Sequence, residues 1–193
     1  MRLRHRVPQG AVVITLPGAL IDKKGPQFFI QAAAMLRKRR QGIRYWLVGR
    51  GKLEEELKAQ CEALEMGEQV DFLGHCDNMA EVYAASDLVV CASVKGEGLT
   101  GTLREALAMA RPVVTTDCAG NTELVQEGQT GFVAKAADAA SLAGAILRAL
   151  NDPPRAQALA EAGRARVLAL CAEPVRSQNV ERIYREVLVE KMQ

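Results

Sequence analysis

The sequence predicts a doubly wound α/β domain, Rossmann-like and three-layered, with about six parallel strands. Short apolar runs alternate with stretches of helical periodicity through short connections, as expected for parallel strands joined by crossover helices. The strand segments are continuously apolar, which is typical of strands covered on both faces. Apolar residues make up 49% of the 193 residues and aromatic residues only 4%, so the core must be aliphatic. An aliphatic core favours helices packed on a parallel sheet.

Each element is delimited by its own periodicity and by glycine or proline at its ends. A buried strand over 11–18 ends in Pro-Gly, and the helix that follows carries Pro26 in its first turn. Strands are predicted at 11–18, 43–51, 69–74, 87–93, 112–117 and 130–135. Helices are predicted at 25–40, 52–66 and 78–85, then one after the fourth strand that ends at about 110, and further helices at 138–150, 154–170 and 176–191. The residues from Asn121 to Gly128 predict a short helical turn. We expect a single domain over 1–193, with a sheet core at about 11–150 and C-terminal helices over 154–191.

Composition excludes several function classes. The net charge of +2 gives no field that would attract nucleic acid. Basic clusters occur at residues 2–6 and 37–40, and the second is interpreted as a solvated helix end. Two histidines and five cysteines without a CxxC pair give no metal-ligand spacing, and free thiols favour a reducing cytoplasm. No apolar run is long enough for a transmembrane helix.

In a doubly wound fold, ligands bind outside the carboxyl ends of the strands. The loop after the fourth strand is rich in glycine and opens a helix. Gly98 and Gly101 would let the backbone approach a phosphate closely, and the helix N-terminus offers free N–H groups. Lys24, in the loop after the first strand, is a candidate second clamp. The sequence therefore predicts an anion site at this edge of the sheet.

Two glutamates, Glu97 and Glu105, bracket this loop with seven residues between them. A carboxylate suits hydroxyl groups rather than phosphate, because an ionised carboxylate only accepts hydrogen bonds. One glutamate could then bind a ribose and the other a sugar. Two alternatives stay open at this point: Thr102 and Glu105 also fit a capping box, S/T-x-x-E, and Glu97 alone could be a solvated loop residue.

The motifs occur in a characteristic order: K-G opening the first helix, "WLVGRG" before "EEEL", "VDFLGH" before "YAASDLVVCAS", and "EGLTGTLREALAMARPVVTTDCAGNTELVQEGQTGFV". This order, over residues 11–135, resembles the C-terminal domain of a retaining glycosyltransferase of the family 4, or group 1, type with the GT-B architecture. The resemblance implies that the domain binds a nucleotide-diphosphate sugar as donor substrate, without a cofactor and without a metal ion. An N-terminal domain would bind the acceptor.

The resemblance also implies roles for individual residues. Glu105 would accept the ribose hydroxyls, Glu97 would contact the donor sugar at the reacting face, and Lys24 would neutralise the diphosphate. Further donor-binding positions are Gly18, His75, Cys76, Gly98, Leu99, Thr100, Gly101 and Thr102. The histidine and cysteine would lie along the base.

The sequence departs from the family pattern in three places. Ala19 stands where the family has an arginine that shares the diphosphate, and Thr100 stands where it has a glycine. The N-terminal acceptor domain is absent from these 193 residues, so we expect the chain to be inactive by itself. The resemblance implies a cytoplasmic protein, peripheral to the inner face of the membrane in a full-length enzyme.

The last predicted helix carries an apolar stripe that bears on the absent domain. Its residues are Val180, Ile183, Tyr184, Val187 and Leu188. The stripe could pack on its own sheet domain or form a docking face for the acceptor domain. Two other functions stay open: a GT-B-type sugar-nucleotide epimerase, for which His75 is the sole loop histidine at the strand ends, and a non-catalytic nucleotide-sugar-binding or assembly module.

Overall fold

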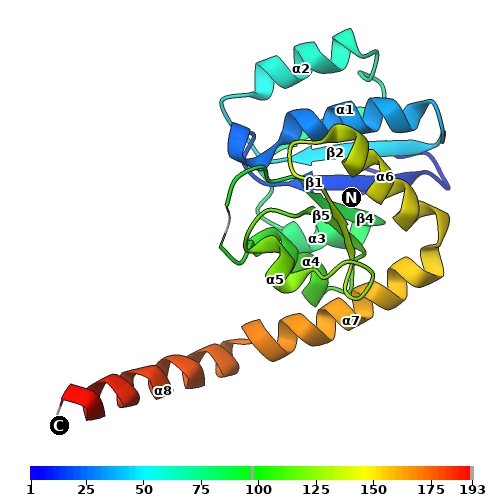
Figure 1. The fold of residues 1–193 in the computed structure, drawn as a ribbon. Helices are drawn as coiled ribbons and strands as arrows, with labels where there is room; N and C mark the ends of the chain where they lie inside the picture. The colour runs from blue at the N-terminus through cyan, green and yellow to red at the C-terminus, as the bar shows by residue number, and fades with distance from the viewer. Residues whose placement is uncertain (97, 192–193) are drawn as a thin grey trace.

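A six-stranded parallel sheet forms the centre of the protein (Figure 1). The computed structural model describes residues 1–96 and 98–191. The strands are β1 (Val12–Pro17), β2 (Ile43–Val48), β3 (Val70–Gly74), β4 (Leu88–Cys91), β5 (Val113–Thr116) and β6 (Phe132–Ala134). Between and after them lie η1 (Asp22–Lys24), α1 (Pro26–Arg37), α2 (Glu54–Ala63), α3 (Met79–Ala85), α4 (Gly101–Ala108), α5 (Asn121–Leu124), α6 (Ala139–Asn151), α7 (Pro153–Cys171) and α8 (Glu173–Lys191). The predicted fold class and its six parallel strands are confirmed.

The strands follow the order β3-β2-β1-β4-β5-β6, and every pairing is parallel. The chain therefore moves outward from β1 to β3, returns to pair β4 with β1, and continues outward in the other direction. The connection that follows β1 leads to β2 on one side of it, whereas the connection that follows β4 leads to β5 on the opposite side. This reversal of strand order creates a crevice at the carboxyl ends of β1 and β4.

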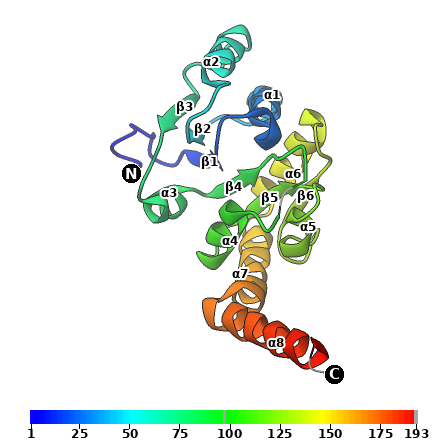
Figure 2. The ribbon, with the colours of Figure 1, turned by 90° about the vertical axis from the view of Figure 1, so that its left-hand side faces the viewer.

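Helices cover both faces of the sheet, which explains why the strands are apolar throughout (Figure 2). On one face, alternate strand residues such as Ile14 and Leu16 join a buried cluster with α1 and α6. On the other face, Val89 and Cys91 pack with buried residues of α3, α4 and α7. The predicted aliphatic core is present, because leucine, valine, isoleucine and alanine make up most of it.

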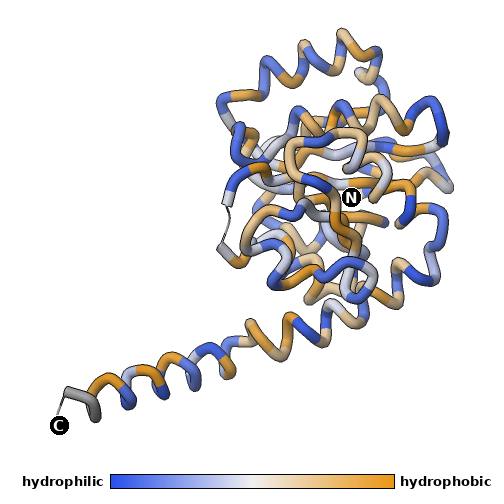
Figure 3. Tube along the Cα trace, viewed as in Figure 1, coloured by the Kyte–Doolittle hydropathy of each residue, from blue (hydrophilic) through white to orange (hydrophobic). Residues whose placement is uncertain are grey.

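The C-terminal helix α8 extends away from the sheet domain after α7 (Figure 1). Hydrophobic residues recur along it (Figure 3). The five residues of the apolar stripe are all exposed, with between 44% and 67% of their surface accessible. Of the two arrangements left open by the sequence, packing of the stripe on its own sheet domain is wrong.

One residue of the N-terminal basic cluster, Arg2, has a structural role that the sequence did not indicate. Arg2 donates hydrogen bonds to the carbonyls of Ala85 and Ala11 and pairs with Asp87 at 2.5 Å. The Asp87 carboxylate also accepts from the amide of Val13 at 2.7 Å. Arg2 therefore fastens the N-terminal segment to the junction of α3, β4 and β1.

None of the helices in the described ranges is both long enough and apolar enough to cross a membrane.

Candidate functional site

The loops that follow β1 and β4 lie against each other at the carboxyl edge of the sheet. The amide of Val94 donates a hydrogen bond to the carbonyl of Lys23 at 2.9 Å. The hydroxyl of Thr102, in the first turn of α4, lies 3.4 Å from the carbonyl of Pro17 at the end of β1. The start of α4 is thus held beside the end of β1, at the crevice that the strand order creates.

Glycines allow this close approach of backbone to backbone. Gly25 has the left-handed φ of 63°, and a Cβ there would lie 2.2 Å from the carbonyl oxygen of Ala92. At Gly49, with φ of 147°, a Cβ would lie 2.0 Å from the carbonyl oxygen of Gly18. Either contact is far inside van der Waals distance. The sequence indicated that Gly49 ends a strand, and the structure adds that only glycine fits against the neighbouring loop.

The side chain of Lys24 lies over the loop that follows β1. A Cβ placed on Gly18 would be 3.9 Å from Cδ of Lys24, so the lysine side chain passes across Gly18. Thr102 lies close to Gly18 as well, because its hydroxyl contacts the carbonyl of Pro17, the residue before Gly18. The structure therefore brings Gly18, Lys24 and the start of α4 together, as the sequence predicted.

Thr100, which departs from the expected glycine, is the N-cap residue of α4. Its φ and ψ are −62° and 126°, a conformation open to any residue, so glycine is not required there. Its side chain turns inward and donates to the buried Asn121 Oδ1 at 2.7 Å. The amide of Asn121 in turn lies 3.5 Å from the Thr116 hydroxyl. Thr100 therefore ties the loop after β4 to the loop after β5.

The capping-box interpretation of Glu105 is wrong. The N-cap of α4 is Thr100, and Thr102 already lies inside the helix, where no side-chain cap bond is formed. Glu105 Oε2 instead accepts a hydrogen bond from the hydroxyl of Tyr83 at 2.7 Å. Glu105 Oε1 lies 3.7 Å from the place a Cβ on Gly101 would take. The carboxylate thus folds back over the first turn of α4, and Glu105 remains exposed.

Other predicted residues lie outside this group. Gly98 and Leu99 are exposed in the loop, and Glu97 lies outside the described residues. His75 and Cys76 follow β3, two strands from β1 along the same edge. His75 Nε2 is 3.1 Å from the carboxylate of Asp77.

Two features of the site were missed by sequence reasoning. The first is an ion pair of 2.5 Å between Asp22 and Lys52, which joins the loops after β1 and β2. Its hydrogen bond lowers the pKa of Asp22 and raises the pKa of Lys52. The second is Tyr83, whose place in a short helix gave no functional signal. Burial, followed by the hydrogen bond to Glu105, raises the pKa of the Tyr83 hydroxyl.

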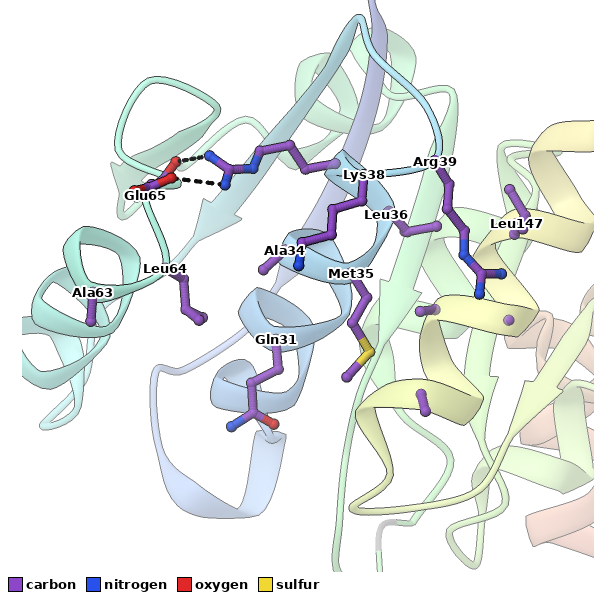
Figure 4. Close-up of a pocket in the computed structure, with 14 residues that line it drawn as sticks. Gln31, Ala34, Met35, Leu36, Lys38, Arg39, Ala63, Leu64, Glu65 and Leu147 are labelled. Atoms are coloured by element: carbon purple, nitrogen blue, oxygen red, sulfur yellow. Dashed lines mark hydrogen bonds and ion pairs between the residues drawn. The ribbon is translucent and has the colours of Figure 1, made fainter.

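A cavity of about 670 Å³ lies elsewhere, between the ends of α1 and α2 and the first half of α6 (Figure 4). Its rim holds the basic residues 37–39, and Arg37 pairs there with Glu65 at 3.1 Å. None of the residues at the crevice lines it. Among the described residues, no group of three or more His, Cys, Asp or Glu side chains is placed to hold a metal ion.

The comparisons with known proteins show the family to which the chain belongs. Residues 2–166 match the model of the family "Glycosyl transferases group 1", and the chain belongs to that family. Its structural neighbours are GT-B glycosyltransferases.

Three similar proteins illustrate the relationship. A GDP-mannose-dependent alpha-(1-6)-phosphatidylinositol monomannoside mannosyltransferase of Mycolicibacterium smegmatis is 33% identical over 172 residues, which cover 85% of this chain and 45% of that protein. A glycogen synthase of Mycobacterium tuberculosis is 31% identical, over 84% of this chain and 40% of that protein. The crystal structure of Anabaena Alr3699/HepE in complex with UDP superposes with a TM-score of 0.87 at 25% identity, covering 95% of this chain and 51% of that chain. The chain spans about half the length of the relatives that it matches.

Proposed function

We propose that this chain is the donor-binding domain of a retaining glycosyltransferase, which takes a sugar from a nucleotide-diphosphate sugar. The observation that carries the proposal is the convergence of Lys24, the first turn of α4 and the Glu105 carboxylate at one crevice. A cation and a helix N-terminus suit a diphosphate, and a carboxylate oxygen beside them suits ribose hydroxyls. Membership of the group 1 family supports the same assignment.

In this proposal the diphosphate is held without a metal ion and without a cofactor. Lys24 and the free N–H groups at the start of α4 stabilise the negative charge that develops on the leaving diphosphate. Glu105 accepts the ribose hydroxyls, and Glu97 contacts the donor sugar at the reacting face. His75 and Cys76 line the more distant part of the edge, towards the base.

Titration calorimetry with UDP, GDP and ADP tests the proposal. We expect one of the three to bind with a dissociation constant well below that of the other two, and we expect removal of divalent ions by a chelator to leave that affinity unchanged. UDP is the first to try, because Anabaena HepE was crystallised with UDP. Absence of binding by all three would overturn the proposal.

We place the acceptor site on a second domain that docks on α8. The relatives are about twice as long as this chain, and the stripe on α8 presents an unpartnered apolar surface to solvent. Burying such a stripe is favourable because it removes apolar surface from water. On this view the chain binds the donor but transfers sugar only when that domain is supplied.

Replacing Ile183 and Val187 together with aspartate tests the exposure of α8. Since 51% and 44% of these residues are accessible, we expect the melting temperature of this chain to stay within about 2 °C. As a control, Val167→Asp in α7 places a charge at a site only 4% exposed, and we expect that variant to unfold. A large loss of melting temperature in the double variant would show that α8 packs on the sheet domain.

A non-catalytic nucleotide-sugar-binding module is the second candidate, and Ala19 is the observation that favours it. The position next to Gly18 is exposed and lacks the cation that the family pattern has there. One fewer charge on the diphosphate lowers the stabilisation of the leaving group. Transfer assays with a supplied N-terminal domain distinguish the two candidates, since a module would bind donor without turnover.

Ala19→Arg should therefore tighten nucleoside diphosphate binding. A charge-assisted contact contributes about 1.5–3 kcal/mol, so we expect a gain of roughly 10- to 150-fold at low salt that shrinks as salt is added. Calorimetry at two salt concentrations measures both effects. Ala59→Arg, on the exposed side of α2, adds the same charge away from the crevice and should leave affinity nearly unchanged. Equal affinities for wild type and Ala19→Arg would show that position 19 does not face the phosphates.

A further inference from the structure

Tyr83 belongs to α3 and reaches α4 through the core on one side of the sheet. The side chain is 2% exposed and packs among buried residues of β4, α4 and α7. Its hydroxyl is directed to Glu105 Oε2 at 2.7 Å, across 22 positions of sequence. The tyrosine therefore touches the candidate site from beneath, without being exposed at the crevice.

The position of this hydroxyl is fixed by the end of α3. The Ser86 hydroxyl, three residues after Tyr83, donates to the Val82 carbonyl at 2.8 Å and lies 2.6 Å from the Thr15 hydroxyl in the middle of β1. Arg2 adds a hydrogen bond to the Ala85 carbonyl at 2.8 Å. These bonds hold α3 against β1, so the Tyr83 hydroxyl is a rigid donor.

The hydrogen bond from Tyr83 restricts the orientation of the Glu105 carboxylate. An exposed glutamate has several rotamers of similar energy, and ordering it costs conformational entropy at the moment of binding. Here Oε2 is engaged by a rigid donor, which leaves Oε1 over Gly101 at the start of α4. A carboxylate held in this way presents one defined oxygen to a ligand that lies across the first turn of the helix.

We propose that Tyr83 is a positioning residue that sets the carboxylate of Glu105 for recognition of ribose hydroxyls. The inference rests on the proposed donor-binding function and extends it to a residue that does not itself contact the donor. On this proposal, the preference of the site for ribonucleotides over deoxyribonucleotides depends on two residues, the exposed Glu105 and the buried Tyr83.

The experiment measures ribose discrimination in Tyr83→Phe, which keeps the ring and removes the hydroxyl. For wild type and variant, dissociation constants are determined for UDP, GDP and ADP and for their 2′-deoxy and 3′-deoxy counterparts. Wild type should prefer the ribose form of the nucleotide that binds. Tyr83→Phe should lower that preference about tenfold while the affinity for the counterpart lacking the recognised hydroxyl stays nearly unchanged. A purely structural loss would weaken both forms alike.

Tyr45→Phe is the matched control. Tyr45 is 1% exposed, and its hydroxyl has no hydrogen-bond partner within the described ranges. Removing an unpaired buried hydroxyl costs no hydrogen bond, so Tyr45→Phe should melt at the same temperature as wild type or higher, with unchanged ribose preference.

A measurement on the wild type covers the case in which Tyr83→Phe does not fold. The chain has three tyrosines, so ¹³Cζ-labelled tyrosine gives three resonances that can be assigned with Tyr45→Phe and Tyr184→Phe. The Tyr83 resonance should shift on addition of the ribose form and respond less to the counterpart lacking the recognised hydroxyl.

The outcomes distinguish failure of the proposed donor-binding function from failure of the proposed role of Tyr83. If wild type binds none of the three nucleoside diphosphates, both the donor-binding function and the role of Tyr83 are overturned. If wild type binds and discriminates, but Tyr83→Phe discriminates equally or the Tyr83 resonance responds identically to both forms, the role of Tyr83 alone is overturned.

Discussion

Glu105→Gln is expected to weaken nucleoside diphosphate binding by roughly 30-fold, about 2 kcal/mol, with little change in melting temperature. The glutamine carbonyl can still accept from Tyr83, so the buried hydroxyl keeps a partner. The other end of the amide is a donor, and the negative charge is lost. The ribose then loses the stronger, charge-assisted acceptor.

Two further variants make this result specific. Glu62→Gln, at an exposed position of α2, removes the same charge and should leave affinity unchanged. Glu105→Ala should weaken binding as Glu105→Gln does, but it should also lower stability by about 1–3 kcal/mol because the buried Tyr83 hydroxyl loses its hydrogen bond to Glu105. Calorimetry and thermal melting of the three variants separate binding from folding. Unchanged affinity in Glu105→Gln would show that the carboxylate does not contact the nucleotide.

Gly25→Ala is expected to destabilise the fold by about 3–5 kcal/mol, the largest effect on stability that we predict for a single methyl group. A left-handed conformation costs a non-glycine residue about 1–2 kcal/mol. In addition, the new Cβ would lie 2.2 Å from the carbonyl oxygen of Ala92, which is backbone and can yield only if the loop after β4 moves. That movement would separate Lys24 from the start of α4, so affinity for the nucleotide should fall as well.

Gly42→Ala is the control for the conformational part alone. Its φ is 74°, similar to that of Gly25, and a Cβ there meets nothing within 4 Å. We expect a loss of about 1 kcal/mol in urea unfolding and unchanged nucleotide affinity. Equal losses in the two variants would mean that the loops after β1 and β4 separate at little cost.

The fold was predictable because its signals are local. The alternation of apolar runs and helical periodicity placed the strands and long helices within a few residues, as in the strand predicted at 130–135 and observed as β6. The three-residue turn η1 was missed, since three residues carry no periodicity. The crevice was predictable too, because parallel strands with crossover helices place successive loops on one edge.

The contacts within the site were less predictable. Thr102 and Glu105 have the spacing of a capping box, and local pattern could not distinguish that arrangement from an alternative partner. The partner is Tyr83, which is 22 positions away and comes close only because α3 and α4 pack on the same face of the sheet. Likewise, the sequence marks Thr100 only as a departure from the expected glycine, because its partner Asn121 lies 21 positions further along the chain.

The sequence by itself determined the order of the elements, the aliphatic core and the edge at which Lys24, Gly18 and the glycine-rich loop meet. These properties follow from periodicity and composition, which act over a few residues or over the whole chain. Only the tertiary structure decided that Glu105 bonds to Tyr83, that Thr100 turns inward to Asn121, and that the stripe on α8 faces solvent. Each of these depends on where one packed element comes to lie against another, and a single hydrogen bond or exposed stripe leaves no periodic trace in the sequence.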